Sequence, residues 1–241
     1  MQKILVIQTA FIGDVVLSTS LLESLHHSYP NVEIDILVRK GNESLFESHP
    51  FLHKVLIWDK KNNKYLNWLK LLFQIRAARY DVVVNVQRYA ATGFWAVLSG
   101  AIQKIGFDKN PLSFLFTHRV KHEALNDHLH EINRNHALLT VLGEIALVKP
   151  ALYPSAKHAS MVANYQTKPY LCIAPASVWY TKQYPLENWV RLMNEIPFNG
   201  PIYLIGGPGD HLLCEQICQD SKRKGVENLA GKLSFLALIN L

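Results

Sequence analysis

The sequence predicts an α/β protein whose strands form parallel, doubly wound sheets, and two observations lead to that class. Short apolar runs rich in Val and Ile, typical of strands buried on both faces, recur along the chain. Between them lie segments with apolar residues three to four positions apart, a spacing that indicates helices packed by one face. Because the alternation stops near residues 149–154 and then restarts, we expect two such domains.

The first half opens with an apolar run at residues 4–7, which is predicted to be a buried strand. Val15, Leu17, Leu21 and Leu25 form a stripe that indicates a helix directly after it. The same reasoning predicts strands at residues 32–38, 53–57, 80–86 and 103–107, and helices at residues 65–78, 92–101 and 138–146. The apolar face expected for the helix at 65–78 consists of Leu66, Leu69, Leu72, Phe73 and Ile75.

A break in the pattern separates the halves, because Lys149–Pro154 contains two prolines and no periodicity. We therefore predict a first domain at residues 1–148, a linker at 149–168 and a second domain at 169–241. In the second domain we expect strands at 170–174, 202–205 and 226–229, and helices at 186–196, 211–221 and from Ser234 to the last residue. Since a sheet commonly has five or six strands, we expect this second domain to be incomplete.

Composition and charge narrow the functional classes. Apolar residues make up 49% of the chain and charged residues 18%, which favours folded domains over disorder. No apolar run approaches the roughly 18 to 20 residues of a membrane span, and the start resembles no signal peptide, so we expect a cytoplasmic protein. The net charge of +6 is spread over both halves, which suits anionic substrates or an anionic membrane surface. No nucleic-acid-binding motif is present, and we expect no such partner.

Asp14 is the first candidate for chemistry, because it follows the strand at 4–7 where open α/β sheets bind their ligands. One interpretation makes it a helix N-cap. The alternative is a proton acceptor, since the turn has one glycine, Gly13, and lacks the G-x-G-x-x-G that a dinucleotide requires. Gln87 and Arg88 follow the strand at 80–86 and are expected at the same edge.

Two loops of the second half are candidates for binding phosphate. Ser177, Thr181 and Lys182 lie before a predicted helix with Pro185 at its first position, and a helix N-terminus suits an anion. A solvated loop lysine is the other interpretation. Gly206 and Gly207 lie in a turn before a helix that Asp210 is expected to cap, where the choice is between a nucleotide site and an ordinary connection.

Histidine and cysteine spacings raise the question of a metal. His118 and His122 are four residues apart, as are members of the series His128, Ile132 and His136, and the region is expected to be a polar helix face. Cys214 and Cys218 show the same spacing. No further ligand stands in register with either pair, so we expect no metal.

Four segments, taken in order, carry a resemblance to a known family. The opening, ILVIQTAFIGDVVLSTSLLESLHHSYPNVEIDILV, resembles that of the family 9 glycosyltransferases, the ADP-heptose:lipopolysaccharide heptosyltransferases. TKQYPLENW is similar to their T-K-x-W-P-x-x-x-W element, with Tyr184 in place of Trp. LIGGPGD and NLAGKLS also fall where that family has a strand and turn and an N-L-x-G-x-[ST] step.

The resemblance implies a GT-B fold of two Rossmann-like domains, with the acceptor on the first and the nucleotide-sugar on the second. Asp14 matches the catalytic aspartate, Lys182 the phosphate-binding lysine, and Ser177 falls near hydroxyl residues that contact the diphosphate. It also implies inverting, metal-independent transfer of a heptose or related sugar from a co-substrate such as ADP-heptose, with no cofactor. The acceptor would be an anionic glycolipid at the inner membrane surface. The family's D-[ST]-G/A-P-M-H segment would lie beyond residue 241, so this chain alone is expected to be inactive.

Two other classes remain open on the residues alone. A nucleotide-binding oxidoreductase would use the same type of sheet, although the missing G-x-G-x-x-G counts against it, and NAD(H) binding would distinguish it. The second is a non-catalytic sugar-, lipid- or nucleotide-binding protein derived from a transferase. The presence of both Asp14 and Lys182 counts against that class, and a transfer assay would decide.

Overall fold

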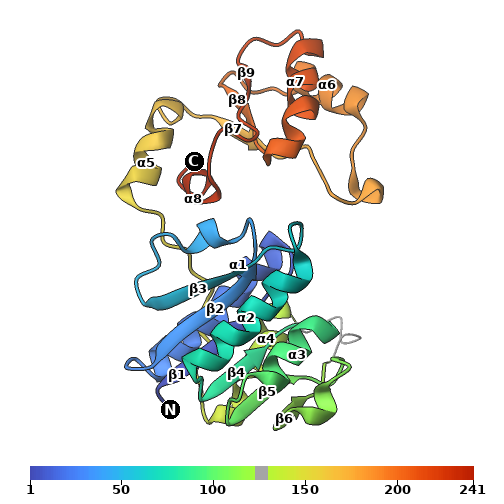
Figure 1. Ribbon diagram of the computed structural model, residues 1–241. Helices are drawn as coiled ribbons and strands as arrows, with labels where there is room; N and C mark the ends of the chain where they lie inside the picture. The colour runs from blue at the N-terminus through green and yellow to red at the C-terminus, as the bar shows by residue number, and fades with distance from the viewer. Residues whose placement is uncertain (123–129) are drawn as a thin grey trace. The chain divides into compact units, whose positions relative to one another are not determined.

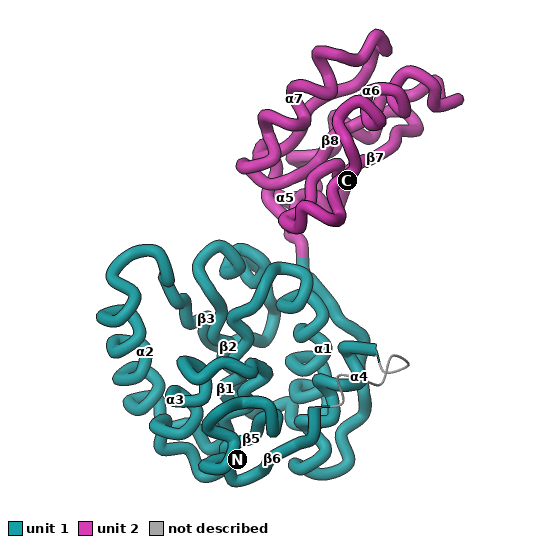
Figure 2. Tube along the Cα trace, turned by 90° about the vertical axis from the view of Figure 1, so that its right-hand side faces the viewer, with its two compact units in different colours: residues 1–153 teal, residues 154–241 magenta. Residues whose placement is uncertain are grey.

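A computed structural model describes residues 1–122 and 130–241, and the chain divides into two compact units. Unit 1 is Met1–Tyr153 and unit 2 is Pro154–Leu241 (Figure 2). The division falls within the stretch from 149 to 168 that was predicted to connect two domains. Both units are α/β and both sheets are parallel, which confirms the predicted fold class.

Unit 1 contains a six-stranded sheet in the order β3-β2-β1-β4-β5-β6. Its strands are β1 (Lys3–Ile7), β2 (Glu33–Arg39), β3 (Leu52–Trp58), β4 (Val82–Asn85), β5 (Gln103–Phe107) and β6 (His118–Val120). All neighbouring pairs are parallel. The strand order reverses between β1 and β4, and a crevice at such a switch point is where open α/β sheets bind ligands.

Helices cover both faces of this sheet (Figures 1 and 2). One face carries α1 (Ile12–Ser28) and α4 (Glu131–His136), and the other carries α2 (Lys64–Ala78) and α3 (Ala90–Leu98). Residues 4–7 of the central strand are 0% exposed. Burial of a large aliphatic side chain contributes about 1.5–3 kcal/mol, so this run fixes α1 and the turn before it to the sheet.

Two predictions for the end of unit 1 are wrong. No helix spans 138–146, because α4 ends at His136 and only a short 3₁₀ turn, Thr140–Leu142, follows. Gly143 then has φ of 125°, a conformation that suits glycine and ends a helical path. Residues 118–120, predicted to lie in a polar helical region, form β6 instead, because their backbone pairs with β5.

Residues 148–153 run along α1, where hydroxyl groups of the helix hold them. Ser20 Oγ donates to the Val148 carbonyl at 2.6 Å, and Ser24 Oγ accepts from the Val148 N–H at 3.0 Å. Two further bonds join Ala151 N–H to Thr19 Oγ1 at 3.1 Å and the Tyr153 hydroxyl to the Glu23 carboxylate at 2.9 Å. The buried hydroxyl side chains of α1 therefore secure the chain where it leaves unit 1.

Unit 2 contains a three-stranded sheet in the order β7-β8-β9. Its strands are β7 (Leu171–Ile173), β8 (Ile202–Leu204) and β9 (Val226–Asn228), and its helices are α5 (Ala156–Val162), α6 (Leu186–Glu195), α7 (His211–Asp220) and α8 (Phe235–Leu238). A core that includes Met193, Leu204 and Ile217 joins α6 and α7 to the sheet.

Helix α5 lies inside the predicted linker, where no element was expected. Ser155 and His158 cap its first turn reciprocally, and the Ser155 N–H donates to His158 Nδ1 at 3.0 Å. A capping box normally has Glu or Gln at the fourth position. The signal was therefore not recognisable in the sequence.

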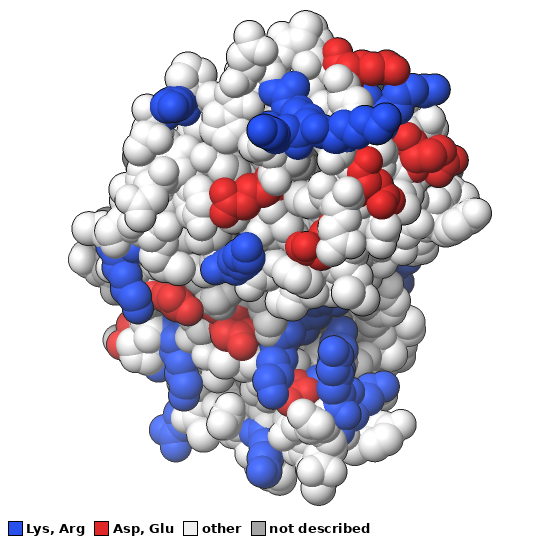
Figure 3. Space-filling model, turned by 90° about the horizontal axis from the view of Figure 1, so that it is seen from above, with Lys and Arg blue, Asp and Glu red and all other residues white. Residues whose placement is uncertain are grey.

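Within the described residues no helix is both long and apolar, and on the face drawn in Figure 3 the charged side chains do not form a single block. Every helix in the described ranges is too short or too polar to span a lipid bilayer. On the face drawn in Figure 3, Lys and Arg side chains form several groups with Asp and Glu side chains among them.

Candidate functional site

The switch point of the first sheet brings together the side chains predicted for one half of the site. β1 and β4 are direct neighbours, and the chain continues from β1 into α1 on one face and from β4 into α3 on the other. Asp14 and Gly13 follow β1, whereas Gln87 and Arg88 follow β4. Four residues from two segments more than 70 positions apart therefore lie at one edge of the sheet.

Asp14 is not an N-cap. The helix begins at Ile12, Phe11 is the capping residue, and Asp14 is the third residue of the first turn. Its side chain is half-buried and forms no hydrogen bond with any residue that the structure describes. An acidic residue there suits the helix dipole, but a carboxylate without a protein partner is also free to accept a proton from a ligand.

Buried amides hold the turn that carries Asp14. Gln87 Nε2 donates to Gln8 Oε1, and the same oxygen accepts the Ala10 N–H at 3.3 Å. From the other side, Asn42 Nδ2 donates to the Ala10 carbonyl at 3.1 Å. Gln87 thus positions the turn as well as bordering it. The sequence analysis did not identify Gln8 or Asn42.

Two polar atoms at the ends of β1 and β4 have no partner. Thr9 Oγ1 and Asn85 Nδ2 are buried, and neither forms a hydrogen bond within residues 1–122 and 130–241. A buried polar group without a partner is uncommon and often indicates a functional site. The only sequence signal was a polar residue at the end of an apolar run, as in Val82–Asn85.

The surface beside Asp14 is open. A Cβ built on Gly13 would meet no atom within 4 Å. Arg88 is exposed, and its guanidinium lies 5.5 Å from the centroid of the Tyr89 ring. Of the three residues predicted on the acceptor side, Gly13 and Arg88 are thus accessible to a ligand, whereas Gln87 is buried.

A group of cations lies next to the same turn. The Arg39 guanidinium stacks over the Phe11 ring at 4.5 Å, and Lys60 Nζ lies 3.5 Å from the Thr9 carbonyl oxygen. Burial lowers the pKa of Lys60, and the positive charges of Arg39 and Lys64 lower it further. An anion bound here would relieve that repulsion.

In unit 2, the predicted phosphate-binding residues follow neighbouring strands. Lys182 is the last residue of a 3₁₀ turn, Tyr180–Lys182, after β7, and its exposed side chain has no partner among the described residues. Thr181 is exposed in the same turn. Ser177 Oγ accepts the Trp179 N–H at 3.2 Å, which shapes the loop.

The helix after this loop starts at residue 186, as the predicted range 186–196 has it, but Pro185 is not its first residue. α6 begins at Leu186, and Pro185 is its N-cap with ψ of 144°. Lys182 therefore lies before the helix, separated from it by three residues. Tyr184 stands where the T-K-x-W-P-x-x-x-W element of the family 9 glycosyltransferases has Trp. Its ring packs edge-on against Trp189, with ring centroids 5.1 Å apart.

The glycine turn after β8 contains a carboxylate. The Gly207 N–H donates to Asp210 Oδ2 at 2.8 Å, and a Cβ on Gly206 would lie 2.8 Å from that oxygen. Asp210 therefore bonds back to the turn, and its side chain does not cap α7 as predicted. A phosphate would have to displace this bond to use the Gly207 N–H.

The histidines predicted as one polar helix face belong to different elements. His118 lies in β6, His122 follows it, and His136 ends α4, while His128 is outside the described residues. In the part of the chain that the structure describes, no group of three His, Cys, Asp or Glu side chains is arranged to hold a metal.

Comparison with protein families gives a match over most of the chain. The model of glycosyltransferase family 9 (heptosyltransferase) matches residues 68–241, a range that includes Gln87, Arg88 and Lys182 but not Asp14. Lipopolysaccharide heptosyltransferase 3 of Escherichia coli is 27% identical over 248 residues, which cover 93% of this chain and 70% of that protein.

Solved structures show the same fold. A family 9 glycosyl transferase from Veillonella parvula superposes with a TM-score of 0.83 at 18% identity, over 99% of this chain and 72% of that one. The E. coli ADP-heptose LPS heptosyltransferase II superposes with a TM-score of 0.81 at 21% identity, over 100% of this chain and 76% of that one. At these identities the similarity establishes the fold.

Proposed function

The chain belongs to glycosyltransferase family 9, the heptosyltransferases, and on that premise we propose that it transfers a heptose from ADP-heptose to an anionic lipopolysaccharide-core acceptor. The observation that carries the proposal is the Asp14 carboxylate, unpartnered among the described residues, at the switch point of the first sheet. The names of the similar E. coli proteins, which specify lipopolysaccharide and ADP-heptose, support the choice of acceptor and donor.

Asp14 acts as the general base. It takes the proton of the attacking acceptor hydroxyl while that oxygen forms a bond to the anomeric carbon of the donor. The bond from this carbon to the diphosphate oxygen breaks on the opposite side, and the nucleoside diphosphate leaves with the electron pair, so the configuration inverts. General bases contribute about 10²–10⁴-fold to such reactions.

Lys182 stabilises the departing diphosphate. Negative charge builds on the leaving group as the sugar approaches an oxocarbenium ion. Lys182, which has no side-chain partner among the described residues, can stabilise that charge. Ser177 and Thr181 lie in the same loop and supply hydroxyl donors. Gly206 and Gly207 border the donor from the next strand once Asp210 yields the Gly207 N–H. With a lysine in this role, the reaction needs neither a metal nor a cofactor.

The cations beside Asp14 bind the anionic part of the acceptor. Arg39 and Lys60 lie around the turn, and Arg88 borders it from β4. Gly13 leaves room for the acceptor sugar. We place the reaction in the cytoplasm, at the inner membrane surface where such a glycolipid is anchored.

Mass spectrometry of the acceptor tests the proposal directly. The protein, at the full length encoded by its gene, is incubated with ADP-heptose and a lipopolysaccharide that lacks heptose, and ADP release is measured in parallel. We expect one heptose gained per ADP released, with no change on addition of a chelator. ADP release without a mass gain would indicate hydrolysis. ADP binding with neither product would indicate a non-catalytic nucleotide-binding protein, and either result would refute the proposal.

A further inference from the structure

Helix α2 is apolar on two opposite sides. Leu71 and Ile75 face the core and are 4% and 0% exposed. The side turned away from the sheet carries four large apolar side chains, here called the outer stripe: Tyr65, Leu66, Leu69 and Phe73, which are 79%, 60%, 44% and 67% exposed. A surface helix of a soluble domain normally places polar residues on that side.

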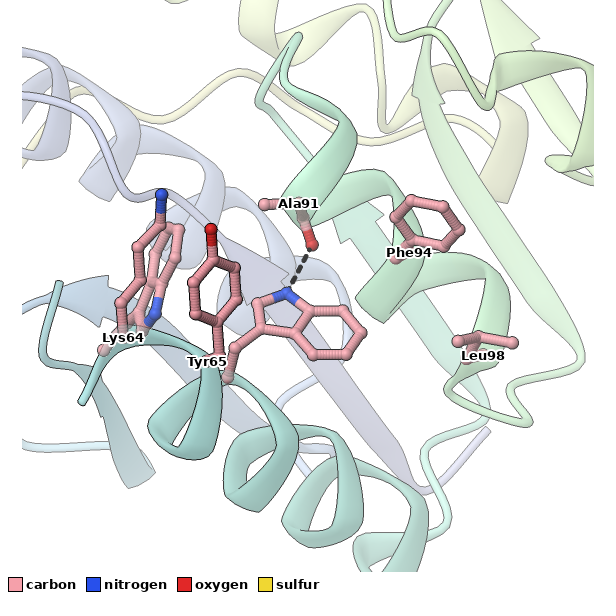
Figure 4. A pocket seen from close by; sticks show the side chains of 7 residues that line it. Lys64, Tyr65, Ala91, Phe94 and Leu98 are labelled. Atoms are coloured by element: carbon pink, nitrogen blue, oxygen red, sulfur yellow. Dashed lines mark hydrogen bonds between the residues drawn. The ribbon is translucent and has the colours of Figure 1, made fainter.

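A cleft between α2 and α3 extends this apolar surface. It has a volume of about 500 Å³ and is lined by Trp58, Lys64, Tyr65, Trp68, Ala91, Phe94 and Leu98. Figure 4 shows Lys64 and Tyr65 on one side of it and Phe94 and Leu98 on the other. The Trp68 indole N–H donates to the Ala91 carbonyl at 3.0 Å, which fixes the two helices at this place. The apolar surface is therefore held in shape by the fold.

The charged residues in the part of the chain around the outer stripe are all cationic. From Lys60 to Tyr80 the chain has six Lys or Arg residues and no Asp or Glu. With 3.6 residues per turn, Lys70 lies beside the stripe, and Arg76 lies in line with Leu69 one turn beyond Phe73. Both are exposed, and Arg76 Nη1 also donates to the Leu98 carbonyl at 2.7 Å. Exposed aromatic and aliphatic side chains bordered by Lys and Arg are typical of helices that lie in the surface of an anionic membrane.

The same charges count against a second copy of this chain as the occupant. Two outer stripes in contact would bring the cations of both α2 helices together with no carboxylate on either helix to pair with them. Juxtaposed like charges oppose association. An anionic lipid surface is complementary to both the apolar and the charged features.

We propose that the outer stripe of α2 binds the surface of an anionic lipid bilayer. The aromatic and aliphatic side chains enter the boundary between headgroups and acyl chains, while Lys70 and Arg76 meet the lipid phosphates. The inference deepens the proposed function and rests on it only for the reason to visit a membrane, namely a lipid-anchored acceptor.

Vesicle flotation tests this without donor or acceptor, so it is independent of the transfer assay. The whole chain is mixed with vesicles of phosphatidylcholine alone or of phosphatidylcholine with phosphatidylglycerol, at low salt. We expect binding to the anionic vesicles. Leu69→Ser combined with Phe73→Ser should lower the partition coefficient at least about tenfold, and Lys70→Gln about fivefold on anionic vesicles only.

The matched control is Met161→Ser combined with Leu212→Ser, which removes exposed apolar side chains from α5 and α7 and should leave binding unchanged. Circular dichroism checks that every variant is folded. The inference fails if the unmodified protein does not bind anionic vesicles. It also fails if the control substitutions in α5 and α7 weaken binding as much as the substitutions in the outer stripe. It also fails if light scattering shows a dimer that the stripe variant abolishes. Transfer to a detergent-dispersed acceptor without vesicle binding would refute this inference and leave the proposed function intact.

Discussion

His49 should make the folded protein sensitive to acid. Its side chain is 1% exposed, and the rings of Phe51 and Tyr153 meet it edge-on at centroid distances of 4.5 and 4.8 Å. Neither ring nitrogen has a hydrogen-bond partner among the described residues, since Glu23 Oε1 is 3.8 Å from Nε2. Burial, with a smaller contribution from His26, lowers the pKa of His49 from 6.5 to about 4.

The direction in which stability changes with pH depends on whether the folded or the unfolded chain binds the proton at His49. Between pH 6.5 and about 4 the unfolded chain binds a proton at His49 that the folded chain does not, so the free energy of unfolding decreases as the pH falls through that window. At 1.36 kcal/mol for each pH unit of separation, the full loss is about 3 kcal/mol. Burial raises the pKa of Glu23, which adds stability as the pH falls and partly offsets the loss.

His49→Phe isolates the contribution of the imidazole, because the Glu23 contribution is present in both proteins. Phe fits an aromatic site and removes two buried nitrogens that lack partners, so we expect a free energy of unfolding within about 1 kcal/mol of the unmodified protein at pH 7. At pH 4.5 the variant should be the more stable by about 2 kcal/mol.

Urea unfolding at both pH values, followed by tryptophan fluorescence, measures this difference. His27→Phe replaces an exposed histidine of α1 and should behave like the unmodified protein. If His49→Phe loses as much stability at pH 4.5 as the unmodified protein does, the imidazole is not held neutral and the reasoning is refuted.

Three further predictions concern the candidate site. Asp14→Asn should lower turnover at least about 10²-fold and the free energy of unfolding by no more than about 1 kcal/mol, because the carboxylate has no partner among the described residues and stabilises α1 only through the helix dipole; near-normal turnover would show that Asp14 is not the general base. Lys182→Met should weaken ADP binding in calorimetry at least about tenfold, on the scale of a charged hydrogen bond, whereas Arg191→Met on α6 should not. Gly13→Ala should keep or raise the melting temperature, since its Cβ meets no atom, and should raise the KM for the acceptor; an unchanged KM would place the acceptor elsewhere.

The strands with long apolar runs were predictable because an unbroken apolar run indicates a strand that is buried on both faces. Residues 4–7 and 82–85 are buried throughout, and only a central strand of a parallel sheet requires such a run. Because these strands could be predicted, the position of Asp14 at the carboxyl edge of the sheet could be predicted as well. β6 was not predictable, since its three residues are His118, Arg119 and Val120 and their strand conformation depends on pairing with β5.

Other features depend on contacts between distant residues. The hydrogen bond between Gln87 and Gln8 joins positions 79 apart. No spacing rule relates them, so the amides that hold the Asp14 turn could not be found from sequence. In α2, periodicity predicted an apolar face but not its direction: Leu66, Leu69 and Phe73, expected in the core, are exposed, whereas Ile75 is buried as expected.

The attachment of residues 148–153 to α1 has a consequence for engineering this protein. α1 carries Asp14 in its first turn and, through Ser20 and Ser24, holds the segment by which the chain departs. A chimaera that replaces the chain from residue 149 onward would remove Ala151 and Tyr153, and with them the bonds to Thr19 Oγ1 and the Glu23 carboxylate, at a cost of about 1 kcal/mol for each lost bond. A junction at Pro154 keeps every one of these bonds. Unit 2 should therefore be exchanged from Pro154 onward, so that the last six residues of unit 1 stay with the helix that carries Asp14.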